Sequence, residues 1–114
     1  MINAEFFLYS GNIFTGFNIS GHSGYSDSGS DIVCASVSSA VQLTANLITD
    51  SFFISADVSA ENNNVSLKIT DRCEISEHST AHKLISALYS HLDMISEEYS
   101  ENIRLTIRRC NIND

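Results

Sequence analysis

The chain has 114 residues, which is enough for one hydrophobic core but too few for two, so we expect a single domain over residues 1–114. Hydrophobic residues make up 43% and charged residues 18%, with 5 Gly and no Pro, which is typical of a folded protein and not of a disordered one. Six Lys and Arg against fourteen Asp and Glu give a net charge of -8, which repels a phosphate backbone and argues against direct nucleic-acid binding.

The N-terminal segment and the cysteines indicate the cellular compartment in which we expect the protein. Residues 1–10 carry no basic residue before their apolar part, and we expect no apolar run of bilayer-spanning length. We therefore expect a cytoplasmic protein that does not bind a membrane. The three cysteines, Cys34, Cys73 and Cys110, are odd in number and lack Cys-x-x-Cys spacing, which favours reduced thiols over a disulfide framework or a zinc ribbon.

Two runs of alternating side chains open the chain. Apolar residues recur at every second position in residues 2–9 and again in residues 13–19, and the intervening Ser-Gly-Asn supplies turn chemistry. The pattern predicts a β-hairpin. Aromatic side chains stand on both faces of the first strand, so we expect Phe7 or Tyr9 to meet a helix, a partner subunit or a substrate.

A loop rich in Gly, Ser and Asp, residues 21–30, leads into a helical pattern. Apolar positions spaced by three and four predict one helix face that runs to about Thr49: Val33, Val37, Ala40, Thr44, Leu47 and Ile48. Ser30 or Asp31 is the expected N-cap, because Ser and Asp side chains accept hydrogen bonds from the first N–H groups of a helix.

The second half of the chain repeats this order. Residues 52–59 and 65–70 are strand candidates, joined by a segment whose Asn residues tolerate the left-handed backbone of a turn. A second amphipathic helix is expected over about residues 76–99, and Ile103, Leu105 and Ile107 predict a last strand. The order ββαββαβ predicts an α+β domain, with a mostly antiparallel sheet of about five strands and two helices packed on one face.

Cys34 and His22 are the candidate reactive pair. With a cap at Ser30 or Asp31, Cys34 falls in the first helical turn, where N–H groups without intrahelical partners and the helix dipole favour a thiolate. His22 lies in the preceding loop, at the same edge of the sheet. A lone Cys on a helix is more often a small buried hydrophobe, and His22 can equally be a solvated or loop-anchoring residue. If Cys34 is a nucleophile, His22 is the base.

Two neighbours of this pair have two interpretations each. Asp31 can orient His22, but a residue at a helix start is more often a cap, and we favour the cap. Ser38 lies one turn beyond Cys34, where its hydroxyl either lines a pocket or bonds back to the carbonyl of residue 34. Both roles of Ser38 are equally consistent with the sequence.

His78 and His82 are four apart on the second helix, with Glu77 and Cys73 nearby, and these residue types can bind a metal ion. Glu77 precedes the first His instead of following it, so the zinc-protease pattern is absent. We expect no metal and no cofactor. Cys73 and Cys110 each follow a predicted strand and are interpreted as packing or incidental residues.

The residues from the loop into the helix resemble the signature of a known family. Gly21-His22, Gly29, Asp31-Ile32-Val33-Cys34-Ala35 and Val37-Ser38, in this order, are similar to the ribosomal-processing cysteine proteases of the Prp (YsxB-like) family. The resemblance implies a bacterial endopeptidase that removes a short N-terminal extension from a large-subunit ribosomal protein, the twenty-seventh of that series. It also implies that His22 and Cys34 are the catalytic pair and that the protein is a homodimer.

The loop between the pair has a further expected role. The resemblance implies that it orders over the substrate. We expect Gly24 and Gly29 to act as its hinges, with Gly21 and Ser23 beside His22. We expect the Cys34 thiolate to attack the scissile carbonyl, with N–H groups near Val33 stabilising the oxyanion. The aromatic residues Phe7, Tyr9 and Tyr25 favour an apolar or aromatic substrate side chain.

Two other classes of function remain open at this point. A non-catalytic assembly factor would use the same groove to hold a ribosomal protein tail, and the acidic composition suits a basic partner. A thiol-redox or metal protein is the second class. The rate of Cys34 alkylation separates a protease from a binder, and metal analysis tests the last class.

Overall fold

The computed structural model describes residues 1–21 and 28–110, and gives only the backbone for residues 28–31. Its main elements, in chain order, are β1 (Ile2–Tyr9), β2 (Ile13–Ser20), α1 (Ser28–Asn46), β3 (Ala56–Glu61), β4 (Asn64–Ile69), α2 (Thr80–Glu98) and β5 (Ile103–Arg109). A short π-helical turn, η1 (Leu47–Ser51), continues α1, and a 3-10 turn, η2 (Arg72–Glu74), follows β4. The predicted ββαββαβ order and the α+β class are confirmed.

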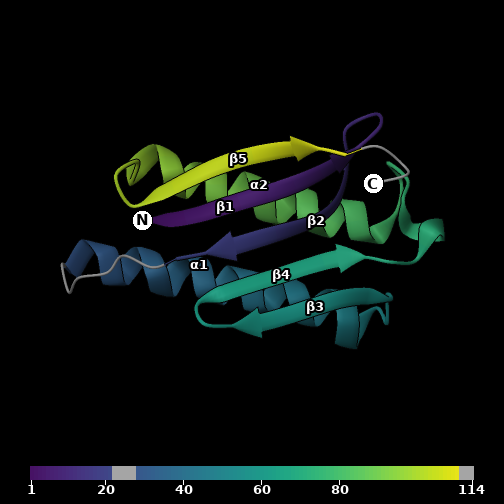
Figure 1. Ribbon diagram of the computed structural model, residues 1–114, viewed down its shortest axis with the longest axis horizontal. Coiled ribbons are helices and arrows are strands. Elements are labelled where there is room, and N and C mark those ends of the chain that lie inside the picture. The colour runs from purple at the N-terminus through teal and green to yellow at the C-terminus, as the bar shows by residue number, and fades with distance from the viewer. Residues whose placement is uncertain (22–27, 111–114) are drawn as a thin grey trace.

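The five strands form one sheet in the order β3-β4-β2-β1-β5. Three neighbouring pairs are antiparallel, and β5 runs parallel to β1, so the sheet is mixed but mostly antiparallel as expected. Both helices lie behind the sheet in Figure 1, α2 behind β1 and β2 and α1 toward β4 and β3. Among the described residues, no helix covers the opposite face of the sheet.

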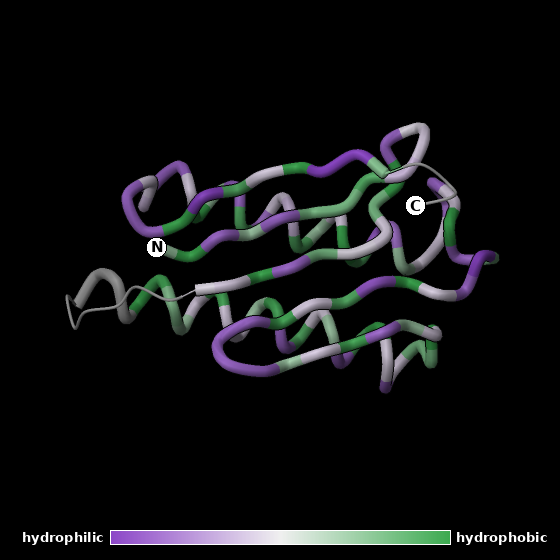
Figure 2. Tube along the Cα trace, in the orientation of Figure 1, coloured by the Kyte–Doolittle hydropathy of each residue, from purple (hydrophilic) through white to green (hydrophobic). Residues whose placement is uncertain are grey.

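The core lies between the sheet and the two helices. Alternate residues of β1 are buried, and hydropathy alternates along the strands in Figure 2, because successive strand side chains point to opposite faces. Phe6 is fully buried, with ring contacts to Phe14, Phe17 and Tyr89 at centroid distances of 6.0, 5.9 and 5.2 Å. The predicted apolar stripe of α2 is confirmed, since Ala81, Ile85, Leu88 and Leu92 are all buried.

Helix α1 is apolar on more than the side that packs on the sheet. Val33, Val37, Val41 and Ile48 are buried, whereas Ile32 and Leu43 are largely exposed. As a result, Ile32–Ser51 is long and apolar enough to cross a membrane by length and composition alone, contrary to the expectation of no such run. The buried side chains of this segment belong to the hydrophobic core, and 33% of the apolar window is buried.

Helix α1 and strand β3 begin at other residues than predicted. Helix α1 begins at Ser28 and not at Ser30 or Asp31, so these two residues lie inside its first turn. Strand β3 begins at Ala56 and not at residue 52, because the chain turns at Phe52 and Phe53. Phe53 adopts a left-handed backbone with φ 52° and is exposed.

Helix α2 begins later than predicted because Ser79 caps it. The Ser79 hydroxyl accepts a hydrogen bond from His82 N at 3.1 Å, which satisfies one of the N–H groups that lack intrahelical partners. The turn that precedes the cap is closed by Ser79 N, which donates to Ser76 O at 3.1 Å. Residues 76–79 therefore form a turn before the helix.

Candidate active site

A cavity of about 410 Å³ lies between α1 and the ends of β2, β4 and β3. Most of its lining is aliphatic and comes from both layers, with Val37 and Val41 on α1 and Val58 and Val65 on the second hairpin. Cys34 is part of this wall. Cys34 therefore lies beside an apolar cavity that is large enough for a side chain or a short stretch of peptide.

Cys34 is half-buried on α1 and packs against the hydrophobic core. Since α1 begins at Ser28, Cys34 lies in the second turn and not in the first. Only the first four N–H groups of a helix lack intrahelical partners, so those of Val33 to Ala35 are committed within α1. The predicted oxyanion donors near Val33 were therefore wrong, and so was the placement of the thiol at the helix end.

Gly21 fixes the backbone immediately before His22. It lines the cavity and adopts φ 83°, a conformation that side chains rarely allow. A Cβ at this position would lie 2.6 Å from Met1 O, and Gly21 N donates to Asn63 O at 3.1 Å. The end of β2 is thereby held between the start of β1 and the β3–β4 turn, in a position that only glycine fits.

The other predicted site residues divide into three groups. Ser38 lines the cavity with Cys34, which favours the first of its two roles. Gly29 and Asp31 lie in the first turn of α1, where only the backbone is described. His22, Ser23 and Gly24 lie outside the described residues, as does Tyr25. The pairing of His22 with Cys34 therefore stays a prediction.

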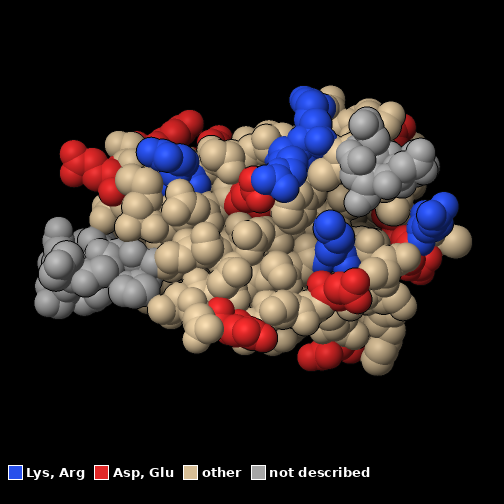
Figure 3. Space-filling model, viewed as in Figure 1, with Lys and Arg blue, Asp and Glu red and all other residues tan. Residues whose placement is uncertain are grey.

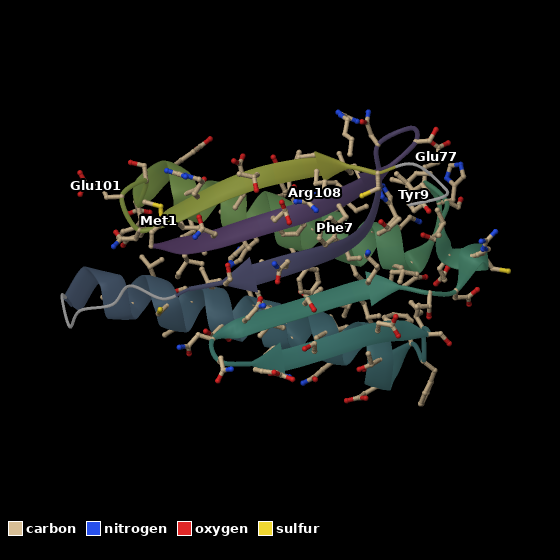
Figure 4. All side chains as sticks on the ribbon, viewed as in Figure 1. Met1, Phe7, Tyr9, Glu77, Glu101 and Arg108 are labelled. Carbon is tan, nitrogen blue, oxygen red and sulfur yellow. The ribbon has the colours of Figure 1, made fainter. Side chains whose placement is uncertain are left out.

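Phe7 and Tyr9 do not line this cavity. Figure 4 shows both toward the end of β1 that lies away from Met1, and Gly21 contacts Met1 at the cavity end. Lys68 Nζ lies 5.5 Å from the centroid of the Phe7 ring on the uncovered sheet face. Tyr9 lines a separate cavity of about 160 Å³. Phe7 and Tyr9 therefore do not belong to the wall beside Cys34, most of which is aliphatic.

Sequence reasoning missed the contribution of the second hairpin to the cavity. Val58 and Ala60 of β3 and Val65 of β4 are part of the wall, together with Asn63 in the turn between these strands. The signal that can find them is the two-residue period, because Val58 and Ala60 share one strand face. The two-residue period does not show which α1 residues this strand face contacts, because those contacts depend on how α1 packs on the sheet.

His82 has a structural role that the sequence did not indicate. Its Nδ1 accepts a hydrogen bond from Phe14 N at 3.0 Å, and its ring stacks on Phe14 at a centroid distance of 5.8 Å. His78 instead forms an exposed pair with Glu77 at 3.3 Å. Within the part of the chain that the structure describes, no group of three His, Cys, Asp or Glu side chains is placed to hold a metal ion.

Comparison with known proteins decides the family. The model of the family "Cysteine protease Prp" matches residues 1–104, which include the whole candidate site. The chain belongs to this family. It is therefore a cysteine protease by membership, as the resemblance implied, and the cavity beside Cys34 is the described part of its candidate active site. No curated protein sequence matches the chain.

Solved structures agree on the fold. The essential ribosomal processing protease Prp from Staphylococcus aureus, with a covalently linked product peptide, superposes with a TM-score of 0.81 at 24% identity, over 95% of this chain and 100% of that one. The same protease with a substrate peptide gives the same values. SMU.848 from Streptococcus mutans gives a TM-score of 0.75 at 21% identity over 96% of each chain. At these identities the likeness shows the fold alone.

Proposed function

We propose that this protein is an endopeptidase that removes the N-terminal extension of a bacterial large-subunit ribosomal protein, the twenty-seventh of the series, during ribosome assembly. The observation that carries the proposal is the position of Cys34, half-buried in the wall of an apolar cavity, in a chain of the cysteine protease Prp family. The ribosomal processing protease of Staphylococcus aureus, which shares the fold, supports the class of substrate.

The reaction proceeds through an acyl-enzyme. His22 accepts the proton of the Cys34 thiol, and the thiolate forms a C–S bond with the scissile carbonyl carbon. The C–N bond then breaks, and His22 gives its proton to the leaving amine. Water, deprotonated by His22, attacks the thioester carbonyl and the C–S bond breaks. The carboxylic acid product loses its proton to solvent, and His22 returns its proton to the Cys34 thiolate. This cycle consumes one water for each peptide bond and returns the enzyme to its starting state.

Gly21 and Ser38 support this pair. Gly21 holds the chain that enters His22 against Met1 and the β3–β4 turn, and Ser38 faces the same cavity as Cys34 one helical turn further along. Ser23, Gly24, Gly29 and Asp31 belong to the segment between the pair, and the family resemblance assigns that segment to closure over the substrate. The protein acts as a cytoplasmic homodimer in this proposal and needs no cofactor.

Mass spectrometry of a peptide that carries the extension and the first residues of the mature ribosomal protein tests this function. The wild-type protein is expected to produce two fragments, and Cys34→Ala is expected to lose at least about a thousandfold in rate, since a catalytic unit fails without its nucleophile. Cys110→Ala is the matched control, because Cys110 follows β5 outside the cavity, and it should cleave normally. Cleavage by Cys34→Ala at the wild-type rate contradicts the proposal.

A further inference from the structure

A second cavity, of about 160 Å³, lies at the end of the sheet where β4 leads into η2. Phe7, Ile69 and Ile75 give it apolar walls, and Lys68 and Arg72 are the charged residues of its lining. Among the described residues that line it, none is Asp or Glu. The whole chain has six Lys and Arg against fourteen Asp and Glu, so the composition does not predict two cations around one small cavity.

Gly16 allows the Phe7 ring and Lys68 to meet beside this cavity. The three residues lie in one row across β1, β2 and β4, since Phe7 and Lys68 are both opposite Gly16 in the strand register. A Cβ on Gly16 would lie 3.2 Å from Cδ2 of Phe7 and 2.5 Å from Leu67 O. Lys68 Nζ lies 5.5 Å from the centroid of the Phe7 ring, which is a cation–π contact. The ring therefore holds the ammonium group beside the cavity.

Thr15 adds a buried hydroxyl to the cavity. The register between β1 and β2 shifts after Phe7, and Thr15 is the extra residue of the resulting β-bulge. Thr15 is 4% exposed and lines the cavity, and its Oγ1 donates to Phe7 O at 3.5 Å. Hydroxyl groups usually donate over about 2.7–2.8 Å, so this hydrogen bond is weak. An oxygen of a bound ligand would offer the hydroxyl a better acceptor.

The neighbouring carboxylates lie outside the cavity. Asp57 is opposite Lys68 in the β3–β4 register, Asp71 caps η2 next to Arg72, and Glu74 ends η2. Figure 3 looks onto the uncovered face of the sheet and shows blue side chains with red ones beside them at its right-hand end. Among the described residues, however, no carboxylate oxygen lies within 4.0 Å of a nitrogen of Lys68 or Arg72. An anion inside the cavity would approach both cations more closely, and would therefore interact with them more strongly.

We propose that the second cavity binds a small organic anion, in which a carboxylate or phosphate group is joined to a short apolar group. Lys68 and Arg72 contact the anionic group, the Thr15 hydroxyl donates to one of its oxygens, and the apolar group packs on Phe7 and Ile75. The cavity is smaller than the roughly 300–1,000 Å³ of sites for drug-sized ligands, which limits the size of the anion. None of its lining residues lines the cavity beside Cys34, so the inference does not rest on the proposed function.

The first test titrates the wild-type protein with benzoate and, separately, with phenyl phosphate, and follows the backbone amide signals by NMR. We expect saturable shifts that are largest at Thr15, Thr70 and Arg72, which line the second cavity. Benzamide has the same ring without the charge, and we expect its Kd to be at least about tenfold higher than that of the better anion. The ratio of the two anion Kd values shows whether the site prefers a carboxylate or a phosphate.

The second test changes the residues that contact the anion. Lys68→Gln and Arg72→Gln are each expected to raise the Kd of the better anion at least about fivefold, because each removes a charge-assisted hydrogen bond. Thr15→Val keeps the shape of the side chain without the hydroxyl, and we expect a rise of about fivefold. The amide spectrum of each variant shows whether it is folded.

Arg104→Gln is the matched control for net charge. Arg104 is exposed and lies opposite Asn3, at the other end of β5 from the second cavity. The variant loses the same charge, and we expect its Kd to stay within about twofold of the wild-type value at physiological salt. A loss as large as that of Lys68→Gln would reveal a general charge effect and overturn the proposal.

Two results on the wild-type protein alone also overturn the proposal, so it stays testable even where a variant fails to fold. One is that neither benzoate nor phenyl phosphate binds more tightly than benzamide. The other is that the amide shifts are largest around Val37 and Val41, which line the cavity beside Cys34, and not around Thr15.

Discussion

The two ends of the sheet are built differently. At one end the cavity lies between α1 and the strands. There, main-chain contacts such as the hydrogen bond from Gly21 N to Asn63 O join the end of β2 to the β3–β4 turn. At the other end Phe14 is fixed by side chains, with its N–H on His82 and its ring 5.3 Å from that of Tyr89. Side-chain packing away from the cavity therefore secures the fold, and the cavity end is available for chemistry.

The largest effect is expected from Gly21→Ala at the cavity end. The new Cβ meets Met1 O and the residue must keep a positive φ, which together cost about 3 kcal/mol of unfolding free energy. Because the backbone before His22 must shift, cleavage should fall as well. Urea unfolding and peptide cleavage measure the two losses.

Gly11→Ala is the control for the backbone conformation alone. Gly11 has φ 81°, but no atom lies within 4 Å of a Cβ built there. We expect a loss of about 1 kcal/mol, with cleavage unchanged. Equal losses in the two variants would show that the contact with Met1 O has no role.

A smaller effect is expected from His82→Ala at the opposite end. The variant leaves Phe14 N without its acceptor and removes the stacked ring, which costs about 2 kcal/mol of unfolding free energy. Cleavage of the ribosomal-protein peptide should persist wherever the variant is folded. His91→Ala, an exposed histidine on the same helix, should change stability by less than about 0.5 kcal/mol. Loss of cleavage in folded His82→Ala would contradict the claim that this end of the sheet contributes to stability and not to cleavage.

Local patterns predicted the elements of this fold well. The two-residue period of β1 and β2 and the three- and four-residue spacing of α2 each reflect burial on one face, and all three elements are present. The run Ser-Asp-Ser-Gly-Ser-Asp, residues 26–31, was less informative. It offers a cap-forming side chain at almost every position, so local preference cannot choose the start of α1. The predicted start was too late, so Cys34 was expected in the first helical turn and lies in the second.

The candidate site was predicted only in part. Cys34 was identified from its place between a loop and a helix, and the structure places it on a cavity wall. The aromatic residues Phe7, Tyr9 and Tyr25 predicted an apolar or aromatic substrate side chain, but the sequence does not show which residues lie near Cys34 while the strand order is unknown. The order β3-β4-β2-β1-β5 puts the second hairpin beside α1 instead, and no local pattern encodes that arrangement.

Alkylation of Cys34 by a small iodoacetamide probe, followed residue by residue by mass spectrometry, tests the central claim most directly. The account predicts fast modification of Cys34 in the wild-type protein, a rate at least about tenfold lower in His22→Ala, and an unchanged rate in His82→Ala, since thiolate formation depends on the adjacent base. Cys73, which is exposed in η2, reports the intrinsic reactivity of a thiol in the same sample. Equal Cys34 rates in the wild-type protein and His22→Ala would contradict the account.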